Sequence, residues 1–132
     1  MKTLDRNLPA LVVDDSRVMC EIMCRILQQI GFSQTEFTTE GVDAILKLKS
    51  KTYGLLVTDL NMNPISGIDL IRAIWADKEI PPTPIVLTSA NHHAVARTVA
   101  DVGREFADVY ILKPFTAEAL DRKLKTVFGE DA

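Results

Sequence analysis

Residues 8–16 decide the class of fold, and they read Leu8-Pro9-Ala10-Leu11-Val12-Val13-Asp14-Asp15-Ser16. A short β-branched run that is apolar on both faces is typical of a strand buried in a parallel sheet. The run stops at two carboxylates. A helical pattern follows, with apolar side chains at positions 18, 19, 22, 23, 26, 27 and 30. The stretch therefore predicts a strand, a turn with two aspartates, and an amphipathic helix.

The same order of strand and helix recurs along the chain. Apolar runs predict strands near residues 32–37, 55–58, 85–87 and 109–112, and helical spacing predicts helices at about 39–49, 66–75, 92–102 and 116–128. Gly31 suits a helix end, Ser66 and Thr116 are typical N-caps, and prolines at 81, 82 and 84 end the third helix. Five such units predict a doubly wound α/β fold, with a parallel sheet covered by helices on both faces.

Composition limits the function. The chain has 132 residues, 47% of them apolar and 25% charged, which is ordinary for one globular domain. We therefore expect a single domain over residues 1–132, with its core at about 8–128. The net charge of −3 argues against nucleic acid or an anionic membrane as a partner. Residues 1–6 lack the apolar segment of a signal peptide, so we expect a cytoplasmic protein.

Polar residues stand at the ends of four predicted strands. Asp14 and Asp15 follow the first strand, Asp59 the third, Thr88 the fourth and Lys113 the fifth. The carboxyl ends of parallel strands share one edge of the sheet, where ligands bind. Three carboxylates there repel one another and need a cation, and an all-oxygen ligand set suits Mg²⁺, with Mn²⁺ as an alternative. One carboxylate can then act as a nucleophile toward a phosphoryl group.

Each of these residues has a plainer role that it fills more often. Paired aspartates after a strand are usually a helix cap and a solvated charge, and a single Asp is usually a turn residue. Threonine at a strand end commonly caps the next helix, and a lysine before proline is usually solvated. The coincidence of all of them at the correct strand ends is what favours a phosphoryl site.

With these motifs, the sequence resembles the receiver domain of response regulators in two-component signalling. Its length is similar to that of the stand-alone chemotaxis regulators. The resemblance covers about residues 8–128 and rests on Leu11-Val12-Val13-Asp14-Asp15-Ser16, Val57-Thr58-Asp59-Leu60-Asn61-Met62, Gly67, Ile85-Val86-Leu87-Thr88-Ser89-Ala90 and Leu112-Lys113-Pro114-Phe115. It implies a flavodoxin-like fold with strand order 2-1-3-4-5. It also implies a signalling switch that catalyses only its own phosphorylation and dephosphorylation, rather than an enzyme with other substrates.

The resemblance assigns the acceptor and the metal ligands. Asp59 matches the phosphoacceptor. Asp14 and Asp15 match the residues that hold Mg²⁺, with Asp15 the more direct ligand and Asp14 acting partly through water. Asp59 and the backbone carbonyl of Asn61 would complete the metal site.

The resemblance also assigns switch and tuning residues. Thr88 would move toward the phosphoryl group, Lys113 would bind one of its oxygens, and the Lys113–Pro114 bond is expected to be cis. Tyr110 matches the aromatic residue that turns inward when the threonine moves, although a strand aromatic packed on the surface would look the same. Asn61 and Ala90 match positions that tune hydrolysis, and we expect moderate access of water to Asp59.

Two departures from the family concern neighbouring loops. Asn63 stands where the family often has proline, and Pro64 follows it. Residues 91–108 lack the usual Gly-Ala before the last strand and are a few residues longer than in compact members. This region belongs to the family's usual signalling face, formed by the fourth helix, fifth strand and fifth helix, so we expect an unusual partner surface.

The implied partners are a histidine kinase or a histidine phosphotransfer protein and an unidentified downstream protein. No DNA-binding segment follows residue 128, so we expect output by protein–protein binding or onward phosphotransfer, from a monomer at rest. A receiver module excised from a larger hybrid kinase or regulator remains open, as does a pseudo-receiver that signals by binding alone. A haloacid-dehalogenase-type phosphatase would need an acid two residues after its nucleophile, where Asn61 stands. A flavodoxin would need a Ser/Thr/Gly-rich phosphate loop after the first strand, where Asp14 and Asp15 stand and would repel the phosphate.

Other residues have structural interpretations. Cys20 and Cys24 share one helix face and are expected to be core thiols, since a zinc site with His92 and His93 fits no known spacing. The two histidines are expected to be solvated. Trp75 is expected to pack in the core.

Overall fold

The computed structural model describes residues 2–129, and its centre is a parallel sheet of strands β1 to β5 in the order β2-β1-β3-β4-β5. All neighbouring strands run parallel. This confirms the predicted doubly wound topology. The strand bounds are β1 Ala10–Val13, β2 Thr35–Thr38, β3 Leu55–Asp59, β4 Ile85–Ser89 and β5 Val109–Leu112.

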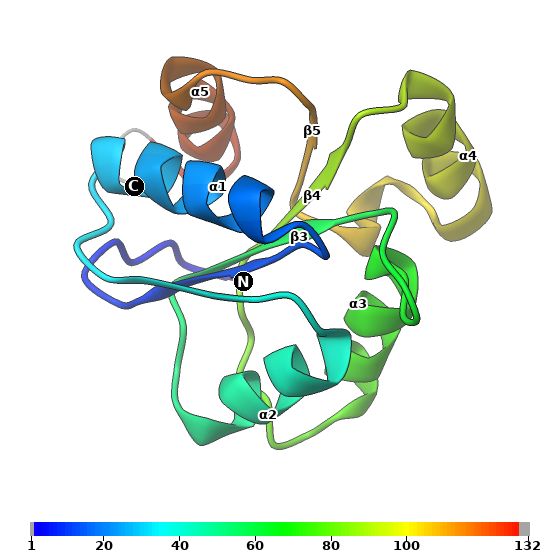
Figure 1. The fold of residues 1–132 in the computed structure, drawn as a ribbon, viewed down its shortest axis with the longest axis horizontal. Coiled ribbons are helices and arrows are strands. Elements are labelled where there is room, and N and C mark those ends of the chain that lie inside the picture. The colour runs from blue at the N-terminus through cyan, green and yellow to red at the C-terminus, as the bar shows by residue number, and fades with distance from the viewer. Residues whose placement is uncertain (1, 130–132) are drawn as a thin grey trace.

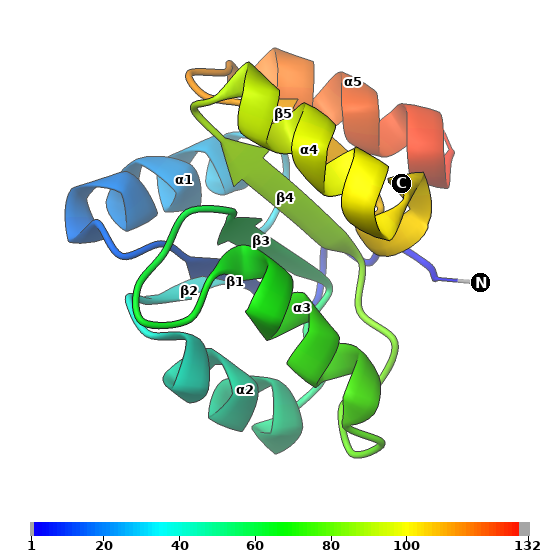
Figure 2. The same ribbon diagram turned by 90° about the vertical axis from the view of Figure 1, so that its right-hand side faces the viewer.

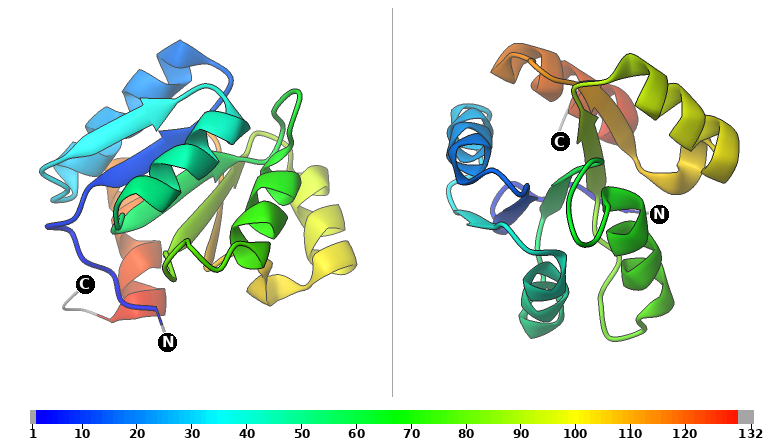
Figure 3. Two further views of the ribbon diagram at one scale, coloured as in Figure 1. Left: turned by 90° about the horizontal axis from the view of Figure 1, so that it is seen from below. Right: turned by 45° about the vertical axis from the view of Figure 1, so that its right-hand side comes forward.

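Helices cover both faces of the sheet (Figure 1). One face carries α1 (Arg17–Gln29) and α5 (Ala117–Phe128), and the other carries α2 (Gly41–Ser50), α3 (Gly67–Ala76) and α4 (His92–Val102). Figures 2 and 3 show α2 and α3 side by side on this second face. Strands β1, β3 and β4 are buried along their whole lengths because both faces are covered.

The helix ends follow the sequence signals. The side chains of Ser16, Ser66 and Thr116 accept hydrogen bonds from backbone N–H groups in the first turns of α1, α3 and α5. Gly31 takes a φ of 109° just after α1, a conformation that favours glycine. These local signals fix where each helix starts and therefore where each strand end opens onto the edge of the sheet.

The structure differs from two expectations. The second strand lies at Thr35–Thr38, later than the expected 32–37. Trp75 is 52% exposed instead of packing in the core. The buried stripe of α3 runs through Ile71 and Ile74. Trp75 follows Ile74 by one residue, so its side chain points about 100° away from this stripe.

A short 3₁₀ helix, η1 (Arg104–Phe106), joins α4 to β5 and was not predicted.

Within residues 2–129, none of the helices combines the length and apolar character needed to cross a bilayer.

Candidate functional site

The predicted polar residues meet at the carboxyl edge of the sheet. Asp59 is the last residue of β3 and is paired across the ladder with Thr88 of β4. Asp14 directly follows β1, and Lys113 directly follows β5. Parallel strands with matched ends therefore bring together residues that are far apart in the sequence, as the pattern indicated.

Three carboxylates form a cluster there. Oxygen atoms of Asp14, Asp15 and Asp59 all lie within 4.8 Å of one another. Asp14 and Asp59 are buried, whereas Asp15 is exposed. One oxygen of Asp14 accepts a hydrogen bond from the N–H of Ser16 at 2.9 Å, which fixes the carboxylate. Carboxylate oxygens without nitrogen or sulfur donors form a ligand set that fits Mg²⁺.

Lys113 links the two buried carboxylates. Its Nζ atom donates to Oδ2 of Asp14 at 3.1 Å and lies 3.2 Å from Oδ1 of Asp59. Burial alone would lower the pKa of Lys113, but the attraction of Asp59 and Asp14 raises it above its ordinary value. The ammonium is therefore held in its charged form and offsets part of the negative charge of the cluster.

Asp59 responds to burial in the opposite way. Desolvation raises the pKa of its carboxyl above the ordinary value, the nearby charge of Asp14 adds to this rise, and Lys113 opposes it. The same desolvation leaves the ionised carboxylate with few water molecules around it, so that the ammonium is its main charged partner. A cation bound beside Asp59 would favour the ionised form further.

Two further groups shape the wall of the site. Thr88 is buried, and its hydroxyl donates to the carbonyl of Thr58 at 3.4 Å. Gly67 lies against the backbone of the acceptor strand, since a Cβ atom there would come within 2.3 Å of the carbonyl oxygen of Asp59. The N–H of Gly67 donates to the carbonyl of Leu60 at 2.9 Å. Gly67 is among the residues that carry the family resemblance, but the sequence did not predict this close approach to the backbone of Asp59.

The remaining predicted residues surround the site without joining its hydrogen bonds. Asn61 and Ala90 are exposed. The Lys113–Pro114 bond is cis, which confirms that expectation, and the Asn63–Pro64 bond is also cis, which was not predicted.

Tyr110 is half-buried in the structure, and its hydroxyl bonds to the backbone on either side of η1. It donates to the carbonyl of Gly103 and accepts from the N–H of Ala107, both at 3.3 Å. The ring therefore takes an outward position, at the side of α4.

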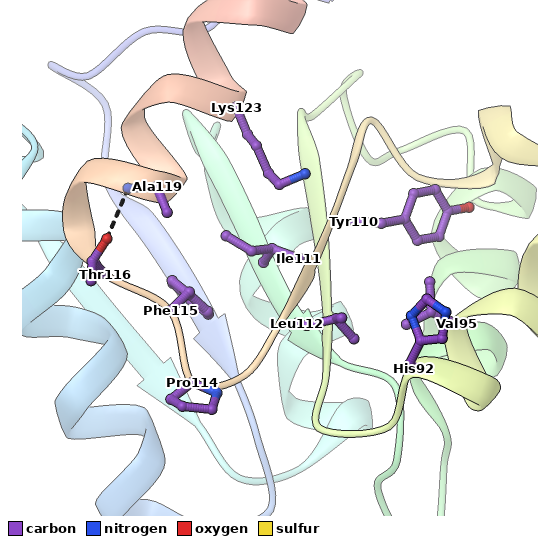
Figure 4. A pocket seen from close by; sticks show the side chains of 10 residues that line it. All are labelled: His92, Val95, Tyr110, Ile111, Leu112, Pro114, Phe115, Thr116, Ala119 and Lys123. Carbon is purple, nitrogen blue, oxygen red and sulfur yellow. Dashed lines mark hydrogen bonds between the residues drawn. The ribbon is translucent and has the colours of Figure 1, made fainter.

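A shallow hollow of about 730 Å³ lies beside the site, between α4, β5 and α5 (Figure 4). Its floor is apolar, with Ile111, Leu112 and Phe115 in the centre, and Lys123 and His92 lie at its rim. Tyr110 projects into the same hollow from β5.

The residues outside the site have simple environments. Both cysteines are free and buried, and both histidines are exposed at the start of α4, as expected. Among residues 2–129, the carboxylate trio is the only group of metal-type side chains that lie close enough to share an ion.

Comparison with known proteins places this geometry in a family. A family model described as the response regulator receiver domain matches residues 10–125. The chain belongs to this family. Chemotaxis protein CheY-3 of Vibrio cholerae is 34% identical over 125 residues, which cover 95% of both chains. The response regulator TrrA of Thermotoga maritima, solved with Mg²⁺ and BeF, has a TM-score of 0.75 at 29% identity, covering 96% of this chain and 99% of that one.

A third receiver domain shows the same fold. It belongs to the sensor histidine kinase PA1611 of Pseudomonas aeruginosa and was solved with magnesium in its active-site cleft. Its TM-score is 0.77 at 21% identity, and the match covers 94% of this chain and 99% of that one. The family expected from the strand-end motifs is therefore confirmed, and the fold with it.

Proposed function

We propose that this receiver domain is a phosphorylation-activated signalling switch in which Asp59 accepts a phosphoryl group from a histidine kinase or a histidine phosphotransfer protein. The observation that carries the proposal is the contact of Lys113 with both Asp14 and Asp59 beside the carboxylate trio. A buried nucleophile, a fixed ammonium and a set of oxygen ligands are the groups that phosphoryl transfer needs.

In the proposed reaction, an oxygen of Asp59 forms a bond to phosphorus while the bond from phosphorus to the donor histidine nitrogen breaks. Lys113 then pairs with a phosphoryl oxygen. Asp14, Asp15, Asp59 and the backbone carbonyl of Asn61 would hold Mg²⁺, or Mn²⁺ in its place, and the bound ion would supply positive charge for the phosphoryl oxygens. TrrA with its bound Mg²⁺ and BeF supports this assignment by its similarity.

In the proposed response, Thr88 leaves the carbonyl of Thr58 to donate to the phosphoryl group, and Tyr110 follows. The face of α4, β5 and α5 then changes and binds a downstream protein or passes the phosphoryl group on. The hollow in this face supports the proposal, because its apolar floor and the Lys123 ammonium at its rim offer a partner both burial and charge. Asn61 and Ala90 would set the access of water and hence the lifetime of the phosphoryl group.

We further propose that the chain acts as one receiver domain over residues 1–132, as a monomer at rest. Nucleic acid and membrane play no part in this proposal. The pseudo-receiver and the excised module remain as the alternatives, and the first is tested directly below.

The deciding experiment is thermal unfolding with Mg²⁺, with and without beryllofluoride, which stands in for a phosphoryl group on an aspartate. We expect beryllofluoride to raise the Tm of the wild type only when Mg²⁺ is present, because a ligand that binds the folded state stabilises it. Asp59→Ala should abolish the rise, and Asp43→Ala, which removes a carboxylate from α2, should keep it. A folded wild type with no rise would refute the switch and favour a pseudo-receiver.

A further inference from the structure

The hydroxyl of Tyr110 links β5 to the short helix η1. It donates to the carbonyl of Gly103, which ends α4, and accepts from the N–H of Ala107, which follows η1. The carbonyl of Gly103 also accepts from the N–H of Phe106 at 3.3 Å. One side-chain oxygen therefore joins both ends of the 3₁₀ turn. Figure 4 shows the ring of Tyr110 projecting from β5.

The outer ends of this segment are fixed by other bonds. The N–H of Gly103 donates to the carbonyl of Val99 at 2.9 Å, and the N–H of Asp108 donates to the carbonyl of Ile85 at 3.0 Å. The side chain of Asp108 also accepts from Lys2 and from the N–H of Ile85. A rearrangement caused by loss of the tyrosine bonds is therefore confined to residues 104–107.

On its other side, η1 contacts the end of α3. Phe106 is buried, and its ring lies 4.7 Å from the ring of Trp75, edge to face at 65°. Trp75 is half-exposed and is the one tryptophan of the chain. A movement of η1 by a fraction of an ångström would therefore change both the packing of this pair and the exposure of the indole.

The bonds of the tyrosine hydroxyl set a condition on the switch. If the ring of Tyr110 turns inward, both bonds must break, and the N–H of the buried Ala107 loses its partner. A buried N–H without a partner is costly, so the turn must rearrange to expose or re-pair it. The inward and outward positions of the ring thus correspond to two arrangements of η1.

We propose that the Tyr110 hydroxyl is a latch that holds η1 in place, and that phosphorylation of Asp59 releases this turn and shifts the Phe106–Trp75 contact. The inference rests on the proposed function, because that function supplies the inward rotation. It adds a second region that responds to phosphorylation, formed by η1 and the end of α3 on the same face of the sheet as α4. Tyr110 is a positioning residue here and does not contact the phosphoryl group.

The test is the fluorescence emission of Trp75, excited selectively, in four proteins with Mg²⁺ and increasing beryllofluoride. In the wild type the emission should shift and saturate at the same beryllofluoride concentration as the thermal stabilisation. Tyr110→Phe should show the shifted emission before any beryllofluoride is added and change no further, while its thermal stabilisation persists. Phe106→Leu keeps the latch and a buried side chain but removes the ring partner, so its emission should change less than that of the wild type.

Tyr53→Phe is the matched control. Tyr53 is the other tyrosine, and its hydroxyl donates to Glu36 at 2.7 Å between β2 and β3, so the same atom is removed elsewhere. This variant should respond as the wild type does.

Two results would overturn the latch. One is a resting emission of Tyr110→Phe that equals the wild type, which decides the matter whether or not beryllofluoride binds. The other is a full emission change in Tyr110→Phe on addition of beryllofluoride. Failure of the proposed function looks different, since thermal stabilisation of the wild type would then be absent.

Discussion

The Nζ atom of Lys113 lies 3.2 Å from Oδ1 of Asp59, so the ends of β5 and β3 are connected across the intervening strand. A phosphoryl group on Asp59 would place oxygens next to this ammonium. Lys113→Met should therefore weaken beryllofluoride binding about 10- to 100-fold, since a hydrogen bond to a charged group contributes about 1.5–3 kcal/mol. Titration followed by Tm measures this, with exposed Lys123→Met as the control. An unchanged midpoint in Lys113→Met would remove the lysine from the proposed site.

Asp15 is the exposed member of a carboxylate cluster that has one nearby ammonium. Asp15→Asn should raise the metal-free unfolding free energy by about 1 kcal/mol at low ionic strength, because two charges about 5 Å apart in a water-like medium repel by that amount. Added salt should shrink the gain. The stabilisation by Mg²⁺ should be largely lost, and urea unfolding with and without Mg²⁺ measures both effects. Glu79→Gln, in the connection after α3, should keep the response to Mg²⁺, and equal responses of all three proteins would contradict the assigned ligand.

Gly67 and Gly41 begin neighbouring helices but face different neighbours. A Cβ atom at Gly67 would lie 2.3 Å from the backbone oxygen of Asp59, whereas one at Gly41 would have the side chain of Ile65 as its nearest neighbour, at 3.3 Å. Gly67→Ala should cost about 1–3 kcal/mol, as overpacking does, and should weaken the beryllofluoride response because the acceptor strand must shift. Gly41→Ala should stay within about 1 kcal/mol of the wild type, since helix propensity offsets the close contact. Equal losses in the two variants would argue against this reading of the Gly67 contact.

The edge of the sheet was predictable because two simple rules apply there. Strands covered on both faces must be apolar along their lengths, so the first charged residue marks the strand end. Parallel strands end on the same side, and this rule predicts from the sequence that Asp14, Asp59 and Lys113 lie together. The roles of these residues came from the resemblance to the family and stay predictions until they are tested.

The helix faces were less predictable. On α2, apolar residues occur all around the helix, and spacing alone does not show that Ala44 and Leu48 pack while Val42 and Leu46 are exposed. Trp75 was misplaced for a related reason, since it follows the buried stripe of α3 by one residue. Apolar character indicates that a side chain can be buried but does not indicate which of several faces meets the sheet.

The partners of the Tyr110 hydroxyl could not be predicted. They are backbone atoms of Gly103 and Ala107, and backbone atoms carry no sequence signal. A single 3₁₀ turn also has too few residues to show a period. The unusual length of residues 91–108 was the one available hint, and it pointed to the region without indicating the contact.

The two cysteines provide a probe of opening on the sheet face opposite Tyr110. Cys20 is fully buried, its thiol donates to the carbonyl of Asp14 at 3.3 Å, and burial is the main cause that raises its pKa to about 11. At pH 8 only about one thiol in a thousand is then ionised, and Ellman's reagent cannot reach it. Both thiols should react slowly in the folded protein and rapidly in urea.

This reaction should also report the proposed ligand. Modification of a buried thiol requires opening, so Mg²⁺ with beryllofluoride should slow it in the wild type by stabilising the closed form, and should leave the rate in Asp59→Ala unchanged. The Cys24→Ala variant isolates Cys20, the more deeply buried thiol, and should show the stronger protection. Rapid labelling of Cys20 in the folded protein would mean that α1 separates readily from the sheet, and a ligand effect that persists in Asp59→Ala would place beryllofluoride elsewhere.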